Sequence, residues 1–74
     1  MKRIEGDGFI AWLEGEKRHR LDGPAIEYQT GKKEWWIEDR LVYPRKALYA
    51  EIIYRGEIPL VIKQQIIEYE LERL

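Results

Sequence analysis

Short segments rich in apolar residues recur about every ten positions from Phe9 to Tyr43, and residues 25–29 alternate between apolar and polar. A period of two is typical of strands with one buried and one exposed face. Gly15, Gly31 and the Asp39-Arg40 pair interrupt the pattern and predict turns. Short strands joined by such turns form an antiparallel meander. We expect three to five short strands, drawn from residues 9–13, 25–29, 33–38 and 41–43.

From Pro44 onward the apolar residues recur at helical spacing. Pro44 suits a first helical position and Gly56 suits the residue after a helix, which predicts a first helix over residues 45–55. Pro59 opens a second helix that runs from Leu60 to about Arg73. The predicted fold class is therefore α+β, an N-terminal antiparallel β-meander followed by two α-helices packed on it.

The second predicted helix has two apolar stripes when its residues are placed at about 100° intervals. One stripe contains Leu60, Ile67, Leu71 and Leu74, and the other contains Ile62, Ile66 and Tyr69. One stripe can cover the sheet. The other is then covered either by the first helix or by a second molecule, and we expect Ile62, Ile66 and Tyr69 to be the self-association surface of a homo-oligomer.

The chain has 74 residues, 13 Lys and Arg against 14 Asp and Glu, and no Cys. This length predicts a single domain over residues 1–74, with a β-meander over 1–43 and a helical part over 44–74. No apolar run approaches the roughly 20 residues of a membrane span, and the basic start at Met1 precedes no apolar signal core. We therefore expect a cytoplasmic protein that does not bind membranes.

Residues 12–15 and 36–39 form a weak repeat, Trp-Leu-Glu-Gly and Trp-Ile-Glu-Asp, 24 positions apart. Between them lies the motif His19-Arg20-Leu21-Asp22-Gly23-Pro24-Ala25. It resembles the His-Arg-x-Asp-Gly-Pro-Ala core of a MORN-like repeat variant that occurs in phage and bacterial proteins. The resemblance covers roughly residues 9–43. It implies a meander of hairpins, no assigned catalytic chemistry, and a phage or mobile-element source, which places the protein in the host cytoplasm.

The same motif predicts a structural turn built from His19, Asp22, Gly23 and Pro24. Asp bonds its own backbone, Gly accepts positive φ and Pro sets the next φ, so these residue types favour a corner. The Asp22 carboxylate can accept a hydrogen bond from the ring of His19 or from the guanidinium of Arg20. We expect one of these bonds to lock the corner.

Catalytic residues, cofactors and metal ligands are not expected. The chain has no Ser or Cys nucleophile, and Thr30 is its one Thr. A lone His without Cys offers too few ligands for a zinc site. The predicted protein is therefore not an enzyme.

Protein binding is the function class that these residues favour. Aromatic and Arg side chains are the usual anchors of interfaces, and the expected partner-binding set is Trp35, Trp36, Tyr28, Tyr43, Arg18, Arg20 and Arg40. Trp35 and Trp36 are adjacent, so they point to opposite faces of a strand and only one of them is exposed. With the phage resemblance, these features predict an inhibitor that binds and occludes a host or defence protein.

Two alternatives stay open. The basic run Lys17–Arg20 and an exposed Trp would suit nucleic acid, with bases stacked on the ring. Acidic residues such as Glu14 and Glu34 interleave with the basic ones, and the net charge is −1. The third alternative is a small molecule or lipid head group held in the cup of the meander by Trp35 or Trp36 together with Arg20.

Overall fold

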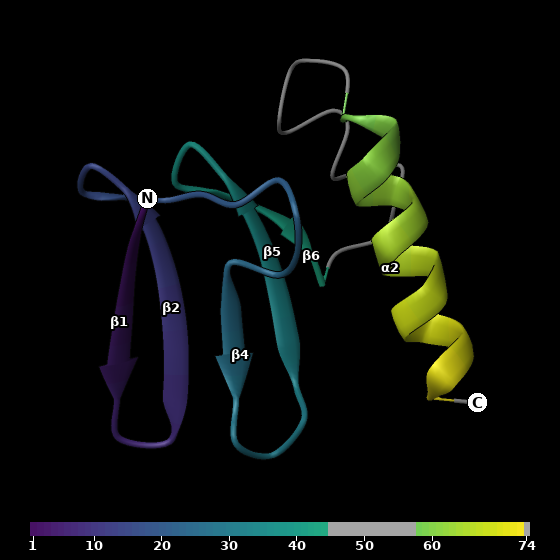
Figure 1. Cartoon of the computed structure of the whole chain (residues 1–74). Helices are drawn as coiled ribbons and strands as arrows, with labels where there is room; N and C mark the ends of the chain where they lie inside the picture. The colour runs from purple at the N-terminus through teal and green to yellow at the C-terminus, as the bar shows by residue number, and fades with distance from the viewer. Residues whose placement is uncertain (45–57, 74) are drawn as a thin grey trace.

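The computed structural model describes residues 1–44 and 58–73, which form an antiparallel sheet followed by one helix. The elements are β1 (Lys2–Gly6), β2 (Phe9–Glu14), β3 (Lys17–Arg18), β4 (Ile26–Tyr28), β5 (Lys33–Ile37), β6 (Arg40–Tyr43) and α2 (Leu60–Glu72). The strand order is β1-β2-β4-β5-β6, and β3 pairs with β2 off this path. Strand β1 lies at one end of the molecule and α2 at the other (Figure 1). The α+β class and the antiparallel meander are confirmed.

The sheet has six strands, more than the three to five predicted. The two missed strands are β1 and β3. Around Ile4, β1 carries mostly charged residues, and β3 consists of Lys17 and Arg18 alone. Neither segment has the alternation of a half-buried strand, and both are strands because β2 supplies their backbone partners. The predicted helix over 45–55 lies outside the described residues, whereas the one expected from Leu60 is confirmed as α2.

The hairpin turns explain three local features of the sequence. Gly15 and Gly31 have φ of 63° and 95°, as their predicted turns require. The last turn is Glu38-Asp39, with φ of 48° and 67°, rather than the predicted Asp39-Arg40. Ile37 pairs with Arg40, and positive φ at both residues between them is the type I′ geometry, one of the two that match the twist of a two-residue hairpin.

The core lies between α2 and the β5–β6 hairpin. Its buried members are Trp35, Ile37, Val42, Ile58, Ile62 and Tyr69. A register shift pairs Trp35 with Tyr43 but Trp36 with Leu41. The Trp35 and Tyr43 rings meet edge-on at 5.8 Å between centroids, and both contact the ring of Tyr69, at 5.4 and 6.1 Å. Helix and sheet are therefore joined by an aromatic cluster.

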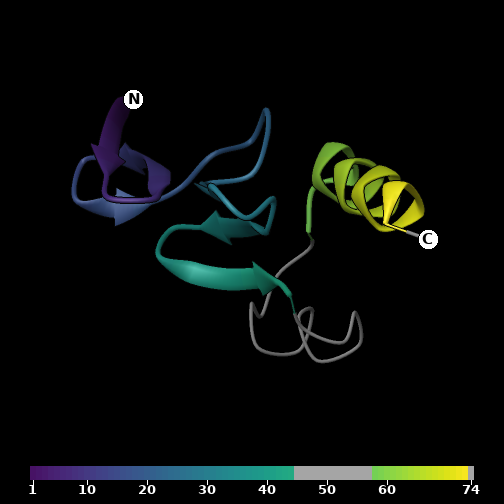
Figure 2. The same cartoon turned by 90° about the horizontal axis from the view of Figure 1, so that it is seen from below.

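Polar contacts fix how α2 sits on the sheet. The Tyr69 hydroxyl donates to the carbonyl of Gly31 at 3.3 Å and accepts from the amide of Lys33 at 3.2 Å. Gln65 accepts from the indole of Trp35 at 2.9 Å and donates to the carbonyl of Leu21 at 3.1 Å. Seen from below, the helix lies beside the sheet at the end opposite β1 and β2 (Figure 2).

These contacts correct the assignment of the two helix stripes. Ile62 is fully buried, Tyr69 is buried, and Ile66 packs against the same core. The stripe expected to make a self-association surface therefore covers the sheet. The helical wheel separates the two stripes but does not orient them. Tyr69 decides the orientation, because a buried hydroxyl needs hydrogen-bond partners and the turn at residues 31–33 supplies them.

Candidate interaction surfaces

Two kinds of surface contain the residues singled out from the sequence. The first is the sheet with its Arg and aromatic side chains, and the second is the side of α2 that faces away from the sheet. On the sheet, Trp35 is 2% exposed and Trp36 is half-buried. The two rings point to opposite faces, as predicted. Trp35 and Tyr43 belong with the core, which leaves Trp36 and Tyr28 as the accessible aromatic candidates.

Trp36 is covered by an Arg of its own chain. The guanidinium of Arg18 lies 3.7 Å from the centre of the ring, and its Nε lies 2.7 Å from the Oδ1 of Asp39. The hydrogen bond from Arg18 holds the pKa of the Asp39 carboxyl below its usual value. Trp36 and Arg18, both predicted to contact a partner, therefore already stack on each other within the chain.

Tyr28 is likewise engaged by its neighbours. Its hydroxyl donates to Oε1 of Glu34 at 3.3 Å, and the indole of Trp36 donates to the same oxygen at 3.1 Å. Burial, followed by the charge of Glu34, raises the pKa of Tyr28. The ammonium of Lys32 lies 5.6 Å from the centre of the Tyr28 ring and 3.7 Å from Glu34. These side chains form a local network in which positive and negative groups are matched.

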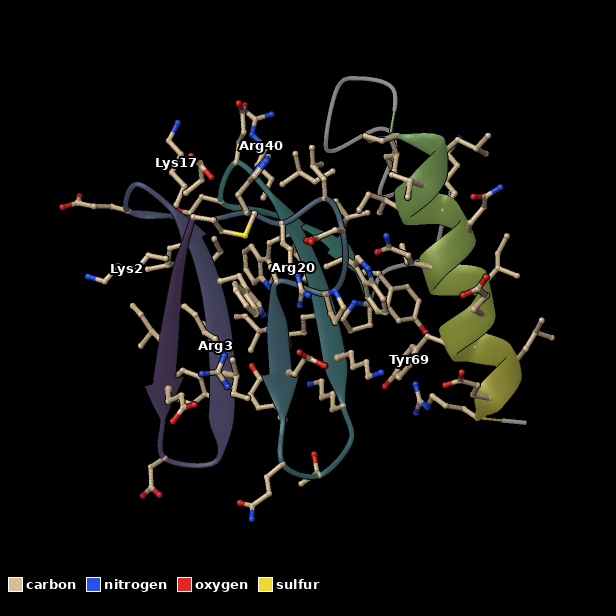
Figure 3. The ribbon with its side chains drawn as sticks, in the orientation of Figure 1. Lys2, Arg3, Lys17, Arg20, Arg40 and Tyr69 are labelled. Carbon is tan, nitrogen blue, oxygen red and sulfur yellow. The ribbon has the colours of Figure 1, made fainter. Side chains whose placement is uncertain are left out.

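Arg20 is the centre of the His-Arg-x-Asp-Gly-Pro-Ala motif. Its Nε donates to Oδ1 of Asp22 at 2.9 Å, and its Nη1 donates to the carbonyl of Pro24 at 3.0 Å. The guanidinium lies 4.3 Å from the centre of the Trp12 ring. Figure 3 shows Arg20 over the middle of the sheet, whereas Lys17 and Arg40 lie at the edge near the turns. The hydrogen bond from Arg20 lowers the pKa of Asp22.

His19 does not bond to Asp22. Its Nδ1 accepts from the backbone amide of Glu38 at 2.9 Å, and the amide of Asp39 donates to the carbonyl of Arg18 at 2.9 Å. The motif therefore ties the β5–β6 turn to β3. The structural role expected for His19 is retained, but it acts between two hairpins rather than within one corner.

Gly23 has a different role from the expected one. Among the glycines with positive φ are Gly8, Gly15 and Gly31, but not Gly23. A Cβ on Gly23 would lie 2.7 Å from Cζ of Arg20 and 3.0 Å from its Nε. The expectation that Gly23 supplies positive φ is wrong. Its missing side chain makes room for the guanidinium of Arg20.

The basic run Lys17–Arg20 does not form one patch. Strand pairing places Ala11, Ile26 and Glu34 side by side, so Trp12 and Trp36 lie on opposite faces of the sheet. Arg20 stacks on Trp12 and Arg18 stacks on Trp36. The two Arg charges are thus separated by the sheet, and each is close to a carboxylate.

Two of the hollows on the described part of the chain do not match the predicted cup. One of about 390 Å³ lies beside Glu5, Phe9, Glu27 and Tyr28. The other, of about 400 Å³, lies beside Glu14, Lys17, His19 and Glu38. Trp35, Trp36 and Arg20, which the sequence suggested for holding a small molecule or head group, line neither of them.

The outer side of α2 carries large apolar side chains that the sheet does not cover. Leu60 is 68% exposed, Val61 47%, Ile67 57% and Leu71 61%. We call these four residues the outer stripe. Three of them belong to the stripe that was expected to cover the sheet. The hydroxyl of Tyr69 is the sequence feature that could have identified the buried side, since a Tyr within an apolar stripe favours a face where its hydroxyl finds partners.

Comparison of the chain with protein-family models, curated proteins and solved structures found no match. The likeness to MORN-like repeats therefore stays a prediction from the motif at residues 19–25. Within residues 1–44 and 58–73, no helix is long and apolar enough to cross a membrane. The function of each candidate surface is therefore inferred from its own geometry.

Proposed function

We propose that this chain is a non-catalytic protein-interaction protein whose contact surface is the outer stripe of α2. The observation that carries the proposal is the exposure of Leu60, Ile67 and Leu71, each more than half accessible, on a helix whose other side seals the core. Single exposed apolar residues are ordinary, but neighbouring large ones on one helix face are typical of a docking surface.

The sheet is less suited than α2 to bind a partner because its candidate aromatic and Arg anchors already contact one another. Trp36 and Trp12 are stacked on Arg18 and Arg20, and the two arginines lie on opposite faces. Nucleic acid would meet neither a free aromatic platform nor a continuous basic groove there. Protein binding through α2 needs no rearrangement of these contacts.

A narrower form of the proposal follows from the motif at residues 19–25. If its resemblance to repeats of phage and bacterial proteins reflects origin, the chain acts as an inhibitor that occludes a host or defence protein. Occlusion requires only a stable complementary surface, and no residue has to perform chemistry. This form makes α2 the inhibitory surface and the sheet its support.

The proposal is tested by comparing the wild type with Ile67→Glu and with Glu68→Gln as the matched control. Both substitutions fall on exposed neighbouring positions of α2, so far-UV circular dichroism and thermal unfolding should be nearly unchanged. Each protein is examined alone by sedimentation and, as immobilised bait, in host lysate. We expect Ile67→Glu to abolish complex formation in whichever assay the wild type shows it, and Glu68→Gln to retain it. A folded Ile67→Glu variant that behaves like the wild type in both assays would overturn the proposal.

A further inference from the structure

The exposed residues of α2 have the spacing of a two-helix seam. Leu60, Gln64, Ile67 and Leu71 are separated by four, three and four positions, and all four are exposed. Alternating steps of three and four bring side chains back to one line on a helix and are typical of seams between paired helices. Gln64 is the single polar member. The next residue, Gln65, forms hydrogen bonds with Trp35 and Leu21 on the side of α2 that faces the sheet. The seam therefore lies on a different side of the helix.

The charges of α2 are distributed unevenly along its length. Lys63 lies near the start of the helix, while Glu68, Glu70 and Glu72 lie near its end, where Arg73 is the C-cap residue. A helix start favours negative charge and a helix end favours positive charge, each by about 0.3–1 kcal/mol. Arg73 offsets part of the negative charge at the end of α2, and this end keeps an excess of carboxylates.

The same distribution is favourable when a second helix lies antiparallel. We propose that a second copy of this chain covers the outer stripe, with the two α2 helices antiparallel. The inference rests on the proposed function and names the occupant of its surface. Leu60 then faces Leu71 of the second copy, and Gln64 faces its Ile67. In the same register Lys63 lies beside Glu70 of the second copy, and symmetry repeats each contact.

A parallel pair is disfavoured by the same charges. It would bring the two ends that carry Glu68, Glu70 and Glu72 side by side, with six carboxylates, only two Arg73 guanidinium groups and two aligned helix dipoles at one end. The antiparallel pair separates these ends and places each beside the Lys63 end of the other copy. Charge complementarity therefore favours an antiparallel second copy over a parallel one.

Cysteine cross-linking tests the direction, because the native chain has no Cys. Leu60→Cys and Leu71→Cys are prepared as single variants and oxidised separately and as a mixture. The antiparallel pair predicts covalent dimers mainly in the mixture, through residues 60 and 71, because the two positions lie about 16 Å apart along one helix. Disulfides that form equally well within each single variant would overturn the antiparallel arrangement.

A charge exchange tests the proposed register with the seam intact. Lys63→Glu should raise the dimer dissociation constant about tenfold, because two weak ion pairs become repulsions. Adding Glu70→Lys to that variant should restore the wild-type dissociation constant. Glu72→Lys, on the same turn but away from the seam, is the control and should not restore it. Failure of the Glu70→Lys rescue with a folded protein would overturn the register.

Sedimentation of the wild type over a dilution series separates failure of this inference from failure of the proposed function. A concentration-dependent dimer that Ile67→Glu abolishes supports both. A chain that stays monomeric at high concentration overturns the self-pairing. If Ile67→Glu nevertheless abolishes capture of another protein in that case, the proposed function stands and its partner is not a second copy.

Discussion

Gly23 and Arg20 should be strongly coupled in their effects on stability. The side chain of Arg20 is 18% exposed and donates to the carbonyl of Pro24 at 3.0 Å while stacking on Trp12. A partly buried charge-assisted hydrogen bond contributes about 1–2 kcal/mol and the stacking about 1 kcal/mol. The carboxylate of Asp22 is mostly exposed and adds little. Arg20→Ala should therefore lower the free energy of unfolding by about 2–3 kcal/mol.

Gly23→Ala should lose most of the same contacts without touching Arg20 itself. The new Cβ would lie 2.7 Å from Cζ of Arg20, so the guanidinium must leave its place and the free energy of unfolding should fall by about 2 kcal/mol. Gly23 is not among the positive-φ residues. In the Arg20→Ala background the same change should then be neutral, or stabilising by up to about 1 kcal/mol through the unfolded state.

The four proteins of this double-mutant cycle are compared by urea unfolding, with Trp fluorescence as the signal and an unchanged m-value as the check on two-state behaviour. The expected coupling of about 2 kcal/mol is well above the scatter of about 0.5 kcal/mol for independent sites. Arg3→Ala is the control, because Arg3 lies 5.9 Å from the same Trp12 ring but is 45% exposed. If Gly23→Ala costs as much without Arg20 as with it, the cause is the backbone and the reasoning fails.

Three further outcomes follow from the structure. Ile62→Ala should lower the free energy of unfolding by about 2–5 kcal/mol because Ile62 is fully buried. Leu60→Ala should change that of the monomer by about 0.5 kcal/mol or less, and chemical denaturation at protein concentrations too low for self-association compares the two. Glu38→Asn should raise the melting temperature, since Asn tolerates the φ of 48° better than Glu does. The lowered pKa of Asp39 means that its ion pair stabilises the fold at pH values above the ordinary 3.8 and is lost as the pH falls through the folded-state pKa. An NMR titration should show that lowered pKa, and Arg18→Ala should return it to the ordinary range.

Local pattern predicted the elements whose formation depends on their own residues. The alternation over residues 25–29 and the apolar run around Trp35 marked central strands, and the steps of three and four residues after Pro59 marked α2. Gly15 and Gly31 marked turns because positive φ is a property of the single residue. Strand β1 escaped the same analysis, since it is a strand only through its pairing with β2.

The candidate site was less predictable because its contacts join distant segments. The motif contains two residues that could donate to Asp22, a His and an Arg. Pairing between strands places His19 beside the amide of Glu38, and Arg20 is the residue that donates to Asp22. Gly23 was expected to supply positive φ, which it does not. Its role is visible only when the guanidinium of Arg20 lies beside it.

The sequence by itself determined that Trp35 and Trp36 point to opposite faces and that α2 has two apolar stripes, because both follow from the periods of strand and helix. Only the tertiary structure decided which of each pair is buried. Trp35 is in the core because its indole meets Gln65, and the Tyr69 side of α2 faces the sheet because the turn at residues 31–33 satisfies its hydroxyl. These choices depend on atoms thirty or more residues apart, and they leave Leu60, Ile67 and Leu71 facing outward.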